Sequence, residues 1–167
     1  FLDGGGELGT VPLDPAGVAS LEAPVLRAGD HAIVAVYAGD AGFEGTSAAF
    51  TQVIQRAPVS ATTTPAPAAA VFGQPVTFTV AVTSAAGTPT GVVTFSDGAT
   101  VLGTAALAAG QASLTTSALA VGAHDVVATY GGDDDHLAGA APAAAVQVDR
   151  APTAVALAAT PAATVFG

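Results

Sequence analysis

An internal repeat constrains the fold of this chain more than any other feature of its sequence. Five short segments recur about 94 residues further along the chain, all in nearly the same register. The pairs are Phe1–Gly4 with Phe95–Gly98, Leu8–Thr10 with Leu102–Thr104, His31–Asp40 with His124–Asp133, Arg56–Pro58 with Arg150–Pro152, and Val71–Gly73 with Val165–Gly167. This period is too long for a solenoid unit and is the size of one complete sandwich domain.

The repeat divides the chain into three parts. We expect residues 1–58 to be the C-terminal part of a truncated repeat, residues 59–150 to be a complete repeat, and residues 151–167 to be the first strand of a third repeat. The chain starts at Phe1 without a basic-then-apolar leader, and both ends fall within a repeat. We therefore expect it to be a piece of a longer protein.

Short alternating segments indicate β-strands in the complete repeat. Residues 74–83 place valine and phenylalanine on one face and threonine on the other, as a half-buried antiparallel strand does. No window shows a persistent helical period. About seven antiparallel strands are expected: 61–64 or alternatively 71–72 as the first, then 74–83, 91–96, 100–107, 111–116, 123–130 and 143–148.

One repeated segment begins with histidine, as HAIVAVYAGD from His31 and as HDVVATYGGD from His124. Alternate residues of a strand share a face, so His, a β-branched residue, Ala and Tyr form one row in both copies. Only the other row admits polar residues such as Asp125 and Thr129. We expect the histidine row to face the core and the Gly-Asp pair to end the strand.

The composition excludes several classes of partner. Lys is absent, the only cations are Arg27, Arg56 and Arg150, and the formal net charge is −10. Three dispersed arginines cannot form the basic patch that nucleic acid or an anionic membrane surface requires. We also expect no membrane insertion, because no apolar run is long enough to span a bilayer. The absence of Cys excludes disulfides, thiolate zinc sites and cysteine nucleophiles.

The motifs of the complete repeat resemble those of the bacterial Ig-like repeat, group 3 type, of exported and surface-attached proteins. They are the Phe-Gly-Gln-Pro-Val-Thr-Phe opening at Phe72–Phe78, the Pro-Thr-Gly-x-Val-x-Phe-x-Asp-Gly hairpin at Pro89–Gly98, and the Gly-x-His-x-Val-x-Ala-x-Tyr-x-Gly-Asp strand at Gly122–Asp133. The resemblance implies tandem immunoglobulin-like β-sandwiches without a disulfide. It also implies an extracellular location, secreted or at the bacterial cell surface.

The turn after the histidine strand differs between the two copies. Residues 39–45 fit the family pattern Gly-Asp-x-x-Phe-x-Gly, whereas residues 132–139 are one residue longer and contain Asp133, Asp134 and Asp135. We expect this acidic segment to be a solvated loop. The alternative is a calcium site at a domain junction, which would need further oxygen ligands from the next repeat.

Neither histidine segment indicates catalysis. His31 and His124 occupy equivalent positions in two repeats, so they cannot share one site. Each enters its strand near the corner where related sandwiches use a tyrosine to bind the backbone, which favours a structural role. No serine lies in a Gly-x-Ser-x-Gly elbow, and Gly4–Gly6 fits a hairpin turn better than a phosphate loop. We therefore expect no enzyme activity, no cofactor, and no catalytic, cofactor-binding or metal-ligating residue.

These observations favour a non-catalytic structural stalk or spacer module that contributes to adhesion. Its expected partners are the neighbouring repeats of the same chain and an extracellular protein or glycan. The alternative is a ligand-binding module that recognises a glycan or host protein through its loops. Exposed aromatics gathered on one sheet would favour that alternative. The chain has no Trp, both Tyr lie in the inward row, and among the phenylalanines only Phe43 and Phe50 are expected outside the core.

The two junctions are short and contain proline, at Arg56–Pro58 and Arg150–Pro152. Proline fixes its own φ angle and favours extended geometry in the residue before it, so we expect a semi-rigid rod. The truncated first repeat should leave an open strand edge. We hypothesise that the tail, with apolar Val155, Leu157, Val165 and Phe166, fills that edge in the same chain or in a second copy.

Overall fold

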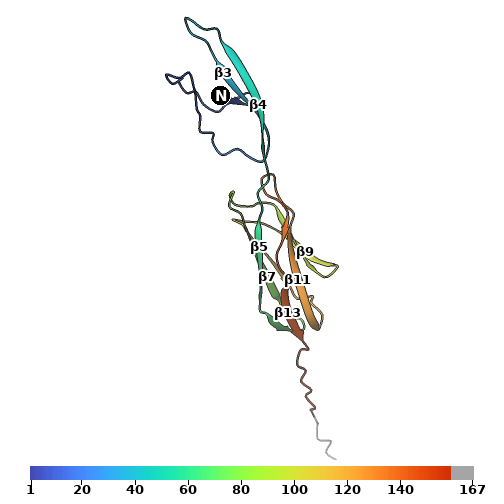
Figure 1. Ribbon diagram of the computed structural model, residues 1–167. Coiled ribbons are helices and arrows are strands. Elements are labelled where there is room, and N and C mark those ends of the chain that lie inside the picture. The colour runs from blue at the N-terminus through green and yellow to red at the C-terminus, as the bar shows by residue number, and fades with distance from the viewer. Residues whose placement is uncertain (159–167) are drawn as a thin grey trace, which may run out of the picture.

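The structure, a computed structural model, describes residues 1–158, in which every regular element is a β-strand (Figure 1). The strands form two units placed end to end. We call β1–β4 the N-terminal sheet and β5–β13 the sandwich. The predicted all-β fold is confirmed, and within the described residues no helix is long and apolar enough to cross a membrane.

The sandwich packs a three-stranded sheet, ordered β10-β7-β5, against a larger one, ordered β6-β13-β11-β8-β9 with β12 beside β11. Paired strands are antiparallel except β6 and β13, which are parallel. The strands are β5 (Ser60–Ala66), β6 (Ala69–Val71), β7 (Val76–Thr83), β8 (Val92–Asp97), β9 (Thr100–Ala106), β10 (Gln111–Thr116), β11 (Gly122–Tyr130), β12 (Gly139–Ala140) and β13 (Ala144–Asp149).

Both predicted positions of the opening strand are occupied. β5 pairs with β7 in one sheet, and β6 pairs with β13 in the other. The chain therefore crosses between the two sheets after Ala66 and before Ala69. This crossing covers the outer edge of β13, which would otherwise present unpaired backbone groups.

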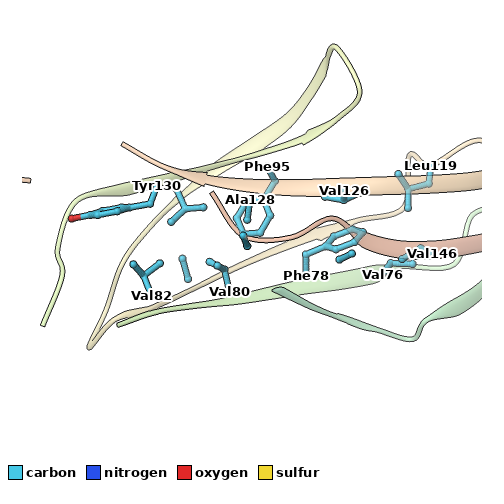
Figure 2. Packing of buried hydrophobic residues seen from close by; sticks show 14 of the residues in the cluster. Val76, Phe78, Val80, Val82, Phe95, Leu119, Val126, Ala128, Tyr130 and Val146 are labelled. Carbon is cyan, nitrogen blue, oxygen red and sulfur yellow. The ribbon is translucent and has the colours of Figure 1, made fainter. Parts of the chain in front are cut away.

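The alternation along β7 matches its burial. Its valines and Phe78 are almost fully buried and pack against residues of β8, β11 and β13 (Figure 2). The opposite face carries threonines, and the hydroxyls of Thr77 and Thr115 share a hydrogen bond of 2.8 Å between β7 and β10. The predicted inward row of β11 is also confirmed, since Val126 and Tyr130 are fully buried.

The N-terminal sheet repeats half of the sandwich. Its strands are β1 (Leu2–Asp3), β2 (Gly6–Glu7), β3 (Gly29–Tyr37) and β4 (Thr46–Ile54), in the order β2-β1-β3-β4. This order matches β9-β8-β11-β13 of the sandwich. The segment from Gly4 to Gly6 forms the hairpin turn predicted from the sequence, with positive φ angles at Gly4 and Gly5.

The inner face of the N-terminal sheet is only partly covered. By the repeat, residues 18–23 correspond to β10, but they form no strand. In the sandwich β10 pairs with β7, and the described residues contain no counterpart of β7 for this sheet. Phe50 of β4 is consequently 60% exposed, beside a hollow that Leu21 and Ile33 also line.

The tail leaves the far end of the sandwich without forming a strand over residues 151–158 (Figure 1). Val155 and Leu157 are exposed, so in this range the tail does not fill the open edge of the N-terminal sheet. The hypothesis is wrong for these residues within the same chain, and exchange of the tail with a second copy stays a prediction. Val165 and Phe166, its other apolar positions, lie outside the described residues.

Candidate functional site

Each corner histidine is held by two hydrogen-bond acceptors. His31 Nδ1 lies 2.6 Å from Asp3 Oδ2, and His31 Nε2 lies 2.9 Å from the carbonyl oxygen of Arg27. His124 repeats this arrangement with Asp97 at 2.6 Å and the Ala120 carbonyl at 2.8 Å. Because a carbonyl and a carboxylate only accept, both ring nitrogens are placed to donate, and the geometry favours the imidazolium form of the ring.

The same hydrogen bonds shift the titration of both rings. Those to the Arg27 carbonyl and to Asp3 raise the pKa of His31 above its ordinary value. For His124, the bonds to Asp97 and then to the Ala120 carbonyl raise the pKa. A doubly protonated ring has no lone pair to act as a base or a metal ligand, so the geometry fits the predicted structural corner role.

The aspartates that complete the two corners were not singled out from the sequence. Asp3 and Asp97 lie on β1 and β8, next to the histidine strand, at the ends of equivalent hairpins. Both belong to the recurring Phe-x-Asp-Gly segment. That recurrence was the signal that could have identified them. The turn itself requires only the glycine, so a carboxylate that precedes it in both copies indicates a separate role for the aspartate.

The turn after the histidine strand has the same backbone conformation in both units. The Asp40 amide donates to the Phe43 carbonyl at 2.9 Å, and the Asp133 amide donates to the His136 carbonyl at 3.2 Å. The extra residue of the second copy therefore lies after the turn, before β13. The sequence pattern left this conformation open, and the hydrogen bonds show that it is conserved between the two units.

Asp133 is the centre of the second turn. Its Oδ1 accepts from the amides of Asp135 and His136 and from His136 Nδ1, at 3.0, 2.8 and 2.8 Å. Its Oδ2 accepts from the amide and the hydroxyl of Thr90, both at 2.9 Å. Burial alone would raise the pKa of Asp133, but these hydrogen bonds together lower it well below its ordinary value.

Asp135 connects the turn to the N-terminal sheet. Its Oδ2 accepts from Arg27 Nη2 at 2.7 Å and from Arg27 Nε at 3.0 Å, and its Oδ1 accepts from the Ala28 amide at 2.9 Å. The guanidinium of Arg27, followed by the Ala28 amide, lowers the pKa of the Asp135 carboxyl. The turn of the sandwich is thus hydrogen-bonded to the Arg27–Ala28 segment of the preceding unit.

The backbone of the same turn grips the linker between the units. The Ala57 amide donates to the Asp135 carbonyl at 2.8 Å, and the Leu137 amide donates to the Ala57 carbonyl at 2.9 Å. Ala57 and the buried His136 form a parallel bridge between these two bonds. We call this set of backbone and side-chain contacts the junction.

The prediction of a solvated loop is wrong for Asp133 and Asp135, and it holds only for the exposed Asp134. The loop also faces the preceding unit, whereas the calcium alternative required oxygens from the following one. The oxygens of both engaged carboxylates already accept hydrogen bonds from the protein. Among residues 1–158, no group of three or more His, Cys, Asp or Glu side chains is arranged to hold a metal ion.

The profile of the family described as bacterial Ig-like domain (group 3) matches residues 1–55 and 62–149. The chain belongs to this family. No curated protein matches the sequence. A solved structure titled "Structures of Clostridium thermocellum CbhA fibronectin(III)-like modules" is 20% identical, covers 57% of this chain and 99% of its own, and superposes with a TM-score of 0.42.

The surface of this bacterial Ig-like chain has no aromatic platform among its described residues. Phe43 is 74% exposed on a turn, Phe50 lies on β4, and Phe72 is 57% exposed just after β6. The exposure of Phe43 and Phe50 was expected, but that of Phe72 was not. These three rings belong to separate elements, whereas the outer face of β7 and β10 carries threonine and serine.

Proposed function

We propose that this chain is a non-catalytic structural stalk or spacer of a bacterial cell-surface or secreted protein, and that it contributes to adhesion by presenting other modules. Residues 1–58, 59–150 and 151–167 are then successive repeats. Membership of the bacterial Ig-like family supports this proposal, because domains of this family are typical of extracellular and surface proteins.

The observation that carries the proposal is the double backbone contact at Ala57. The chain runs from β4 to β5 through residues 55–59 only. Within them, both the N–H and the C=O of Ala57 bind the turn of the following unit. Pro58 comes next and has a fixed φ angle. These bonds fix the linker to the sandwich, and the bonds from Arg27 and Ala28 to Asp135 fix the N-terminal sheet to the same turn. Bending between the units must break one of these two sets of hydrogen bonds, so we expect the two units to form a stiff segment.

The elongated arrangement fits a spacer. The strands of both units run along the long direction of the molecule, and the tail leaves at the end opposite the N-terminal sheet (Figure 1). Strands of about ten residues advance a chain by roughly 30–40 Å per unit. A series of such units would therefore hold a terminal module at a distance proportional to their number.

Small-angle X-ray scattering of the full chain tests the proposal. We expect the pair-distance distribution to be that of one elongated particle, and a single conformation should fit the data. A curve that fits only a broad ensemble, in which compact and extended arrangements of the two units coexist, would contradict the stalk function.

A further inference from the structure

The junction combines backbone hydrogen bonds, which almost any sequence could form, with side-chain hydrogen bonds, which need particular residues. The backbone bonds at Ala57 require no special side chain. The Arg-Ala-Pro segment recurs at Arg150–Pro152, so a following repeat could form the same two backbone hydrogen bonds with Ala151. The bonds from Arg27 and Ala28 to Asp135, in contrast, depend on one arginine and one aspartate.

These two side chains have no counterparts in the other copy. In the register set by the corner histidines, Arg27 corresponds to Ala120, because each lies four residues before its histidine. Asp135 corresponds to Gly42, because each lies two residues after the aspartate of its turn. The charged contact therefore forms in one order only, with the arginine in the preceding unit and the aspartate in the following unit.

The corner histidine positions the arginine. His31 Nε2 donates to the carbonyl of Arg27, while Nδ1 is fixed by Asp3. This contact holds the Arg27–Ala28 segment with its amide directed at Asp135 Oδ1 and its guanidinium at Oδ2. In the sandwich, His124 holds the Ala120 carbonyl in the same way, but a methyl group stands in place of the guanidinium.

The exposure of the Arg27–Asp135 ion pair determines whether it contributes to stability or to the choice of the neighbouring repeat. The side chain of Arg27 is 73% exposed and that of Asp135 is 28% exposed. Exposed pairs add little to stability because water and salt screen them. A wrong partner at the same place, however, would set like charges side by side and leave the pair unmatched, which is how charges produce specificity.

We propose that Arg27, positioned by His31, and Asp135 form a recognition contact that decides which repeat follows which. The Gly-Asp-x-Asp turn at residues 132–135 would select, as its preceding neighbour, a repeat that has arginine four residues before its corner histidine. The partner is thus another Ig-like repeat of the same protein. This inference rests on the stalk function, since order has meaning only in a series of repeats.

A charge-reversal series across the junction tests the contact. The chain has no cysteine, so Thr51→Cys on β4 and Thr129→Cys on β11 provide two unique, exposed sites for spin labels. Distances between the labels are measured by double electron–electron resonance in the labelled protein, in Arg27→Asp, in Asp135→Arg and in the double variant. Asp125→Arg, an exposed aspartate on β11, is the control with the same change of charge as Asp135→Arg.

We expect a single narrow distance peak in the labelled protein and in the Asp125→Arg control. Each single reversal at Arg27 or Asp135 should lose that peak and give a broad distribution, and the double variant should recover it. Arg27→Gln removes only the charge of a largely exposed side chain, so it keeps the fold and should broaden the peak as well.

The outcomes separate this inference from the stalk function. Narrow peaks in Arg27→Asp, Asp135→Arg and Arg27→Gln would overturn the recognition contact and leave the stalk function standing. A double variant as broad as the single ones would also overturn it, since the charges would then not be paired. A broad distribution in the unreversed protein would contradict the stalk function and the contact together.

Discussion

At the scale of single residues, each unit is locked at one corner by a charged histidine. His124 donates to the Asp97 carboxylate of the neighbouring strand and to the Ala120 carbonyl of the preceding loop. Hydrogen bonds to charged groups are stronger than neutral ones. One ring therefore ties the hairpin, the loop and the histidine strand together, and it does so fully only while it is protonated.

Stability should therefore fall as the pH rises above the ordinary histidine pKa of 6.5. The pKa of His124 is raised in the folded state from an ordinary value of 6.5. Below pH 6.5 the ring is charged in both folded and unfolded states and its contribution is complete, whereas it is lost as the pH rises through the raised folded pKa. Urea unfolding across this range measures the effect, and His124→Gln should remove the part that comes from the sandwich while the His31 corner keeps its own.

An NMR titration of the His124 ring provides the direct check. A folded-state pKa at or below 6.5 would contradict the imidazolium corner.

The carboxylates of the junction affect stability in a different pH range. The pKa values of Asp133 and Asp135 are lowered, so their contribution is complete above the ordinary value of 3.8 and is lost only as the pH falls below it.

Calcium should leave the stability of the protein unchanged. Binding at the acidic turn would displace the Thr90 and His136 donors from Asp133 and the Arg27 guanidinium from Asp135. Thermal melts in calcium and then in a chelator should coincide. A rise of several degrees in calcium that is abolished by Asp133→Asn together with Asp135→Asn would show that the turn is a metal site.

At the scale of elements, pairing decides which segments become strands. Residues 18–23 and β10 occupy the same place in the repeat, but only β10 has β7 beside it and only β10 is a strand. A lone strand leaves its backbone groups unpaired. The strand propensity of such a segment is therefore realised only when its neighbour is present.

A matched pair of phenylalanine substitutions tests the burial pattern of the sandwich. Phe78 on β7 is fully buried, whereas Phe72 is 57% exposed. Phe78→Ala should lower the free energy of unfolding by about 3–5 kcal/mol, because it leaves a cavity in the core. Phe72→Ala should change it by no more than about 0.5 kcal/mol. Urea unfolding followed by circular dichroism measures both, and similar losses in the two variants would contradict the assigned core.

Most of the strand positions could be predicted from the sequence, because alternation reports which face of a strand is buried. The prediction of β10 at residues 111–116 is confirmed, and β7 and β11 differ from their predicted bounds only at their first residues. The opening strand remained ambiguous between two segments, since its two halves join different sheets. A local pattern carries no information on such a crossing.

At the scale of the whole molecule, the repeat period predicted a truncated repeat, a complete repeat and the first strand of a third, but the junction could not be predicted. Arg27 and Asp135 are 108 residues apart in sequence and meet only because both the corner and the turn have folded. The acidic triplet was visible as a cluster of charge, yet its charge alone indicated a solvated loop. What it binds depends on the conformation of Asp133 and its five hydrogen bonds.

Residual dipolar couplings test the central claim, a stiff junction, most directly. Backbone N–H couplings of the protein in a weakly aligning medium are measured for β3 and β4 and, separately, for β7, β11 and β13. If the contacts of the junction hold the units together, one alignment tensor will fit both sets. Two different tensors, with a smaller magnitude for the N-terminal sheet, would mean that the units reorient independently and would contradict the account.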